Sequence, residues 1–303
     1  MKKLFLFLFS LVVTLIVFSC KKESKGTTKE TMLSGNMTVF VDESIFPIVE
    51  DQKDVFEKTY RATLNLKSKS EAEIINNIIE DSARVSVMTR LLSSEEESAS
   101  KNRATAKITR FAIDAVVFIA NKESNDSLIE LEQVQAYLNG EESTIKSLIF
   151  DNPNSSVTRN VFEKLNINQD KINNVYSHGT SEELLKFISE NEGHIGVIGI
   201  NWITQTPTEL SKYSENIKIL SVANVKSENG ESKYIFPSQA NIGKKTYPLT
   251  RELFLLNYQG AAGLGMGFAS FIASDIGQKI VLTSGLAPVK LEPMNINIKK
   301  DNK

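Results

Sequence analysis

The ten residues from Phe111 to Ala120, FAIDAVVFIA, are all apolar except Asp114. A run of this kind is typical of a strand buried inside a protein. A carboxylate within such a strand must be paired, solvated at a cleft, or shifted in its pKa, because burying an unpaired charge is costly. Asp114 is therefore a candidate binding residue, with Arg90 as one candidate partner. The structural alternative is a carboxylate that is satisfied by backbone amides.

Strand and helix patterns alternate along the chain, which indicates α/β layers with mostly parallel strand pairing. Hydrophobic periodicity distinguishes the two kinds of segment, and Pro47 lies where the first turn of a helix tolerates it. Strands are predicted at 37–41, 62–66, 86–88, 111–120, 195–200, 217–222 and 253–256, and helices at 47–60, 71–81, 128–137, 161–165, 184–188 and 268–282.

The start of the chain carries the pattern of an export signal. Two lysines precede an apolar run over 4–18, which is shorter than the roughly 20 residues of a membrane-spanning helix. Cys20, the only cysteine, follows this run and resembles the lipid-attachment site of a bacterial lipoprotein. We therefore expect a signal peptide at 1–19 and a lipidated, flexible tether at 20–35, which is rich in Lys, Glu, Ser and Thr. An uncleaved anchor and a plain secreted protein are the alternatives.

Composition argues against several functional classes. The formal net charge of −2 is not that of a nucleic-acid-binding protein, and His178 and His194 are the only two histidines. With no second cysteine, these histidines cannot complete a typical zinc site, and the nucleophile-elbow motif G-x-S-x-G is absent from the sequence. We therefore expect no enzyme, no metal and no cofactor.

Two predicted helices start at residues suited to hold an anion. Ser44 precedes the first helix, and Ser155, Ser156 and Thr158 precede the helix near residue 161. The backbone N–H groups at a helix start have no partner within the helix, and the helix dipole adds partial positive charge there. The alternative is that these residues are ordinary N-caps. Arg90, at the end of a short strand, would either reach a ligand or lie on the surface.

Seven segments in order resemble the PstS-like phosphate-binding proteins of ABC importers, which belong to the type II periplasmic-binding-protein family. They are VDESIFPIVEDQKDVFEKTY, VSVMTRLLSSEE, FAIDAVVFIANKES, NSSVTRNVFEKL, GHIGVIGINWI, TYPLTRELFLL and FIASDIGQKIVLTSGLAPV.

This resemblance implies an α/β, two-lobed periplasmic-binding-protein-like fold. Each lobe would be a mixed, mostly parallel sheet flanked by helices, and two hinge strands would join the lobes. One lobe would comprise 36–118 and 252–303, and the other 119–251. The ligand would lie in the cleft between the lobes, which close over it by bending at the hinge.

The resemblance also implies a set of ligand-binding residues. Asp114 would accept the hydrogen that phosphate carries at neutral pH and sulfate lacks. The chain departs from the family pattern at Asp42-Glu43 in the first loop, at 68–71 in the second, and at Asn152 and Val157. Because of these departures, a related oxyanion is an alternative to phosphate as the ligand. The implied set is Ser44, Ile45, Thr89, Arg90, Asp114, Ser155, Ser156 and Thr158.

The implied function is an extracytoplasmic lipoprotein that captures inorganic phosphate and delivers it to an ABC permease. It would be a monomer in the cell envelope, anchored by lipid to the membrane at the periplasmic or extracellular face, with no nucleic-acid partner. A binding protein for another oxyanion and a phosphate-sensing or envelope lipoprotein without a transport role are the alternatives. A phosphate-ester hydrolase would have to use His178.

Overall fold

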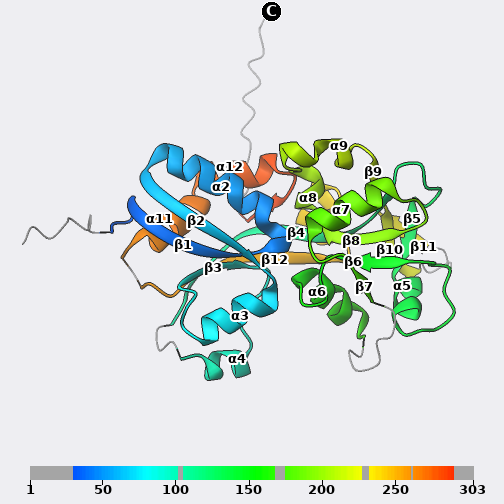
Figure 1. Cartoon of the computed structure of the whole chain (residues 1–303), viewed down its shortest axis with the longest axis horizontal. Coiled ribbons are helices and arrows are strands. Elements are labelled where there is room, and N and C mark those ends of the chain that lie inside the picture. The colour runs from blue at the N-terminus through cyan, green and yellow to red at the C-terminus, as the bar shows by residue number, and fades with distance from the viewer. Residues whose placement is uncertain (1–29, 102–104, 168–174, 227–231, 261, 290–303) are drawn as a thin grey trace, which may run out of the picture.

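The computed structural model describes residues 30–101, 105–167, 175–226, 232–260 and 262–289. Two lobes lie side by side and are joined by β4 (Lys107–Asn121) and β12 (Thr250–Asn257) (Figure 1). The predicted signal peptide, Cys20 and most of the tether lie outside the described residues. Within them, no helix combines the length and the apolar character that crossing a bilayer requires.

In the first lobe, β1 (Ser34–Asp42) pairs in parallel with β2 (Arg61–Lys69) and with β3 (Val85–Met88). Side chains alternate between the two faces of β1. Val39 and Val41 belong to the same apolar cluster as residues of α2 (Phe46–Thr59), α11 (Leu264–Ile272) and α12 (Asp275–Thr283). Phe40 belongs to a second cluster, with residues of α3 (Glu71–Ile79). Helices accordingly cover both faces, and α4 (Ser94–Ala99) lies next to α3 (Figure 1).

In the second lobe, β6 (Leu148–Phe150) pairs in parallel with β7 (Tyr176–Ser177) and with β8 (Ile195–Gly199). A separate small sheet contains β5 (Leu128–Glu130), β10 (Ser221–Lys226) and β11 (Ser232–Ile235). The helices of this lobe include α5 (Leu131–Leu138), α6 (Ser156–Leu165), α7 (Ser181–Glu190), α8 (Asn201–Thr204) and α9 (Ser211–Ser214), with a 3-10 turn at Thr208–Leu210.

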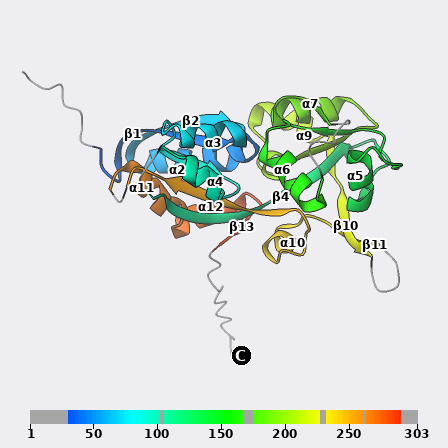
Figure 2. The same ribbon diagram turned by 90° about the horizontal axis from the view of Figure 1, so that it is seen from below.

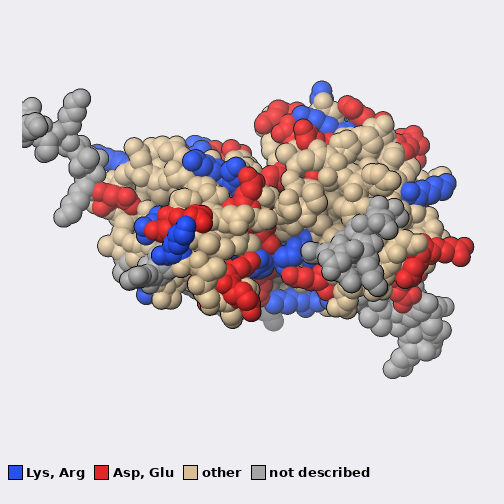
Figure 3. Space-filling view, turned by 60° about the horizontal axis from the view of Figure 1, so that its bottom comes forward, with Lys and Arg blue, Asp and Glu red and all other residues tan. Residues whose placement is uncertain are grey.

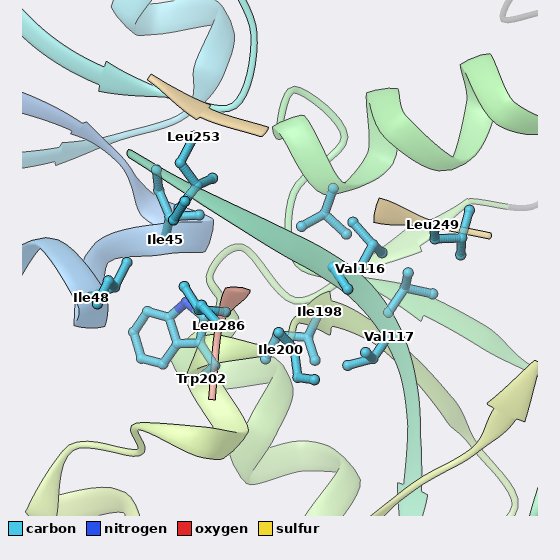
Figure 4. Close-up of a cluster of buried hydrophobic side chains, with 14 of the residues drawn as sticks. Ile45, Ile48, Val116, Val117, Ile198, Ile200, Trp202, Leu249, Leu253 and Leu286 are labelled. Carbon is cyan, nitrogen blue, oxygen red and sulfur yellow. The ribbon is translucent and has the colours of Figure 1, made fainter. Parts of the chain in front are cut away.

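The hinge strand β4 belongs to both lobes. It pairs antiparallel with β12 in the first lobe and with β8 and β9 (Ile217–Ile219) in the second. Seen from below, β4 runs from one lobe into the other (Figure 2), close to β13 (Ala287–Pro288) and α10 (Gln239–Gly243). Apolar side chains such as Val116, Ile198 and Leu253 pack together where the lobes meet (Figure 4). The predicted two-lobed α/β fold with two hinge strands is thus confirmed. The strand pairing is mixed rather than mostly parallel, because the hinge strands pair antiparallel with their neighbours.

Several predicted elements differ from the structure. The helix predicted at 161–165 begins at Ser156, so Ser156 and Thr158 lie inside it and not before it. Residues 128–130 form a strand before α5, 217–222 is divided between β9 and β10, and the helix predicted at 268–282 is two helices. The break occurs because Ser274 caps α12 through Gly277 N–H and donates its own hydroxyl to the carbonyl of Phe271 at 2.6 Å. A Cβ at position 277 would lie 2.4 Å from that same carbonyl oxygen, so glycine permits the tight turn.

Candidate ligand-binding cleft

A cavity of about 160 Å³ lies between the lobes, and charged side chains of both signs meet along the groove there (Figure 3). Its walls come from the ends of β1 and β2 in the first lobe and from the loops before α6 and α7 in the second. The lining residues are Asp42, Glu43, Ser68, Lys69, Ser70, Glu73, Asn152, Ser155, Gly179 and Thr180.

Two of the predicted anion-binding positions meet across the lobes. Ser44 lies in the 3-10 turn η1 (Glu43–Ile45), and its hydroxyl is 2.9 Å from that of Ser156, the first residue of α6. Asp42 holds Ser44 in place, because Asp42 Oδ1 accepts from the backbone N–H and from the hydroxyl of Ser44, at 3.0 and 2.8 Å. Ile45 follows directly, with its side chain in the apolar cluster (Figure 4).

Arg251 links this serine pair to Asp114. Its Nη1 donates to Ser156 Oγ at 2.8 Å, and its Nε and Nη2 lie 2.8 and 2.7 Å from Asp114 Oδ2. The two side chains are 2% and 0% exposed. Burial raises the pKa of Asp114, and the Arg251 guanidinium opposes this rise. The partner of Asp114 is therefore Arg251 and not Arg90.

Arg251 was not among the predicted site residues. The signal lay in the pairing of the two hinge strands, because Arg251 is directly opposite Asp114 in the antiparallel register of β12 and β4. Residues paired in this way on neighbouring strands have adjacent side chains.

Ser155 and Thr158 are engaged within their own loop. Ser155 Oγ accepts from the Thr158 N–H at 3.1 Å, which is an N-cap, and donates to Asp151 Oδ1 at 2.6 Å. Thr158 Oγ1 donates to the carbonyl of Asn152 at 2.7 Å. Burial raises the pKa of Asp151, a residue not predicted to be in the site, to about 7.

Thr89 and Arg90 point towards Glu71 rather than towards the serine pair. The buried Glu71 carboxylate accepts from Thr89 Oγ1 at 3.3 Å and Arg90 Nε at 3.1 Å. From the other lobe, Arg159 Nε and Nη2 donate to it at 2.5 and 3.1 Å. Arg90 also forms a two-pronged ion pair with Glu96, at 2.7 and 2.8 Å. Glu71, Arg90, Glu96 and Arg159 line a cavity of about 530 Å³ between α3 and α6.

Glu43 forms another contact between the lobes. Its carboxylate oxygens accept from the N–H and the hydroxyl of Ser181 at the start of α7, at 3.0 and 2.8 Å. Burial, with a contribution from the nearby Asp151, raises the pKa of Glu43 to about 8. Burial also raises the pKa of Asp42, and Arg251 opposes this rise. Carboxyl groups therefore outnumber cations around the serine pair.

Residues 26–275 match the model of the PBP superfamily domain. The chain belongs to this superfamily. Three solved structures are examples of proteins with a fold similar to that of this chain. The first is a putative phosphate ABC transporter substrate-binding protein with bound phosphate from Clostridium perfringens. It has a TM-score of 0.69 and 18% identity, over 84% of this chain and 100% of that one.

The second is an ABC-type phosphate transport receptor from Vibrio cholerae, with a TM-score of 0.60 and 16% identity over 83% of this chain and 99% of that one. The third is the CcmR regulatory domain of Synechocystis in complex with 2-PG, with a TM-score of 0.51 and 13% identity over 79% of this chain and 96% of that one. Structural similarity at such low sequence identity shows the fold alone. The predicted resemblance to PstS-like proteins is therefore confirmed at the level of the fold. No curated protein matches the sequence.

Proposed function

We propose that this chain is an extracytoplasmic solute-binding lipoprotein that captures inorganic phosphate between its lobes and delivers it to an ABC importer. The observation that carries this proposal is the meeting of Ser44 and Ser156 at 2.9 Å, from opposite lobes, with Arg251 donating to Ser156. Two hydroxyls and a guanidinium thus converge at the junction of the lobes. Such donors replace the water that an anion loses on entering a cleft.

Hinge bending at β4 and β12 would open and close the cleft. We place the boundaries as predicted, with 36–118 and 252–303 in one lobe and 119–251 in the other. Contacts between the lobes would break on opening, among them Ser44–Ser156, Glu43–Ser181 and Glu71–Arg159. Each of these joins a residue of the first lobe to a helix of the second, so closure would form them again.

The residues proposed to bind the ligand divide into two groups. Ser44, the N–H of Ile45, and Ser156 would contact it directly at the junction, and Ser155 and Thr158 shape the start of α6 beside it. Asp114 would act by orienting Arg251, and its Oδ1, which has no hydrogen-bond partner among the described residues, is the atom that could accept a hydrogen from the ligand.

Thr89 and Arg90 form a separate part of the proposed site. They would reach the ligand only where Glu71 releases them, because the Glu71 carboxylate accepts from both residues.

The cellular setting is part of the same proposal. Lipid attached to Cys20 would hold the chain at the membrane, on the periplasmic or extracellular face, where it would act as a monomer with an ABC permease. We propose no catalytic role. His178, the histidine that a hydrolase would need, packs against Phe187 with ring centroids 4.2 Å apart, which favours a structural role.

A second candidate is a sensing lipoprotein without a transport role, or a receptor for another oxyanion. The similarity to a regulatory domain that binds 2-PG favours a sensing role. Neighbouring genes for a permease and an ATPase would argue for transport.

Titration calorimetry on the chain without its leader, from Lys21, tests the proposed ligand. We expect phosphate to bind with micromolar or tighter affinity and sulfate to bind far more weakly. Ser156→Ala should weaken phosphate binding, whereas Ser98→Ala, on the exposed helix α4, should leave it unchanged. Absence of heat on adding phosphate at every pH tested would contradict the proposal.

A further inference from the structure

Two large apolar side chains lie exposed at the tip of a tight turn at the start of the described chain. The turn spans 31–34, where the Thr31 N–H donates to the carbonyl of Ser34 at 2.9 Å and Met32 and Leu33 form the tip. Their exposed fractions are 41% and 49%. Turns in water usually carry Gly, Pro, Asn, Asp or Ser, so two apolar residues at this tip need another reason.

The turn is fixed against α11. The carbonyl of Met32 packs directly on Gly267, and a Cβ at position 267 would collide with that oxygen. Glu30 Oε1 accepts from the Leu264 N–H at the start of α11, at 2.9 Å. The exposure of Met32 and Leu33 is therefore a property of the folded structure and not of a loose chain end.

A third exposed apolar side chain lies beside the turn. Ile276, near the start of α12, is 51% exposed and lines the same groove, of about 370 Å³, as Met32 and Leu33. Tyr60 and Phe271 also line this groove. Single exposed apolar residues are ordinary, whereas a group of them around a groove marks a contact surface. We call Met32, Leu33 and Ile276 the apolar patch.

The apolar patch lies at the end of β1 that is far from the ligand cleft. β1 runs from Ser34, beside the patch, to Asp42, which lines the interlobe cavity (Figure 1). Eight steps along a strand cover about 26 Å. A partner bound at the patch would therefore leave the cleft free.

The chain before Glu30 indicates which partner covers the patch. Glu30 follows Cys20 by ten residues, a stretch that spans at most about 35 Å when fully extended. Lipid on Cys20 would keep the patch within that distance of the bilayer, and the link would make their contact intramolecular. Residues 21–29 include four lysines and one glutamate, a charge that suits anionic lipid headgroups.

The small size of the patch also favours lipid over a protein partner. A stable protein interface uses about 20–30 residues on each side, far more than the patch offers. Contact with a membrane needs only shallow burial of apolar side chains at the boundary between headgroups and acyl chains.

We propose that the apolar patch inserts into the lipid surface to which Cys20 is attached, so that the end of the first lobe away from the cleft rests on the membrane. This inference rests on the lipid anchor of the proposed function and adds to it a contact surface and an orientation. In this orientation the second lobe stays clear of the bilayer, so the hinge strands β4 and β12 are free to bend.

Tryptophan fluorescence with lipids that carry bromine on their acyl chains tests the contact, because bromine quenches a tryptophan that reaches the acyl region. Trp202, the only tryptophan, is 6% exposed in the second lobe. Leu33→Trp adds one at the patch and keeps it apolar. Leu91→Trp is the matched control, since Leu91 is 39% exposed and follows β3, whose end lies beside the cleft end of β1.

The chain from Cys20 is coupled through its thiol to a maleimide lipid in vesicles of phosphatidylcholine and phosphatidylglycerol. We expect bromine to lower the emission of the added tryptophan roughly twofold in Leu33→Trp and by less than about a tenth in Leu91→Trp. Adding Ile276→Ser to Leu33→Trp should recover about half of the lost emission or more. Ile108→Ser, on β4 and with a 50% exposed parent side chain, should leave the quenching unchanged.

The inference would be overturned by equal emission of Leu33→Trp with and without bromine, or by equal quenching at positions 33 and 91. Self-association of the chain from Lys21 in sedimentation, abolished by Ile276→Ser, would overturn it in favour of a second copy as the partner. Failure to bind phosphate, or failure of cells to attach a fatty-acid analogue to Cys20, would instead overturn the proposed function. Neither failure would alter the vesicle result, because the coupling there is chemical.

Discussion

The buried ion pair between Arg251 and Asp114 allows a quantitative test of how the hinge is stabilised. Arg251→Met would leave Asp114, which is 0% exposed, facing an apolar side chain instead of a guanidinium. Breaking a buried pair from one side costs about 3–5 kcal/mol, because an uncompensated charge stays behind. The double variant Arg251→Met/Asp114→Leu removes both charges and should recover most of this loss, since such replacements are often neutral or stabilising.

Urea denaturation followed by far-UV circular dichroism would measure these changes. The same two strands supply a matched control, because Arg110 on β4 lies 2.9 Å from Glu252 on β12 with side-chain exposures of 50% and 27%. Arg110→Met should cost less than about 1 kcal/mol, as is usual for exposed pairs. The coupling energy of the Arg251–Asp114 cycle should accordingly exceed that of the Arg110–Glu252 cycle by about 2 kcal/mol or more.

The reasoning would be refuted by either of two results. In the first, Arg251→Met costs no more than Arg110→Met, which would mean that Asp114 does not depend on its partner. In the second, the double variant is as unstable as Arg251→Met, which would mean that the loss comes from packing of the arginine side chain and not from the charge of Asp114.

Three further predictions concern the cleft. Ser156→Ala removes the contacts with Ser44 and Arg251 and should weaken phosphate binding roughly tenfold, measured by calorimetry. Glu71→Gln weakens the contact with Arg159 and should give a larger radius of gyration without ligand, measured by small-angle X-ray scattering; an unchanged radius would contradict a role in holding the lobes together. The raised pKa of Asp151 means that the folded state binds an extra proton between about pH 4 and 7, so stability should fall by up to about 4 kcal/mol over that range. Asp151→Asn should flatten this decline in urea titrations at each pH.

The fold could be predicted from the sequence because its main elements carry their own local pattern. The apolar run at 111–120 is part of β4, and the periodicity at 47–60 is α2. The elements that were not predicted are short, such as β6 and β13, with three and two residues. Segments of that length carry no periodicity, and they are strands only because β8 and β4 lie beside them.

The residues of the site could be predicted from the sequence only in part, for a related reason. Ser44 and Ser156 were each recognisable as the start of a helix, which is a local property. Their contact, and the pair formed by Arg251 and Asp114, join positions 112 and 137 residues apart. Such contacts depend on how the hinge strands align and how the lobes close, and helix or strand propensity does not record either.

The residues that depart from the family pattern are the ones that define this cleft. Asp42 is 1% exposed and Glu71 is 3% exposed. A loop that had merely drifted in sequence would leave its acids in water, since burying a carboxylate is costly. Here the fold instead surrounds Asp42 with the hydrogen bonds of Ser44, and Glu71 with two arginines. The carboxyl groups of Asp42 and Glu71 are therefore held in fixed positions by their own partners, as parts of the cleft and not as exposed loop residues.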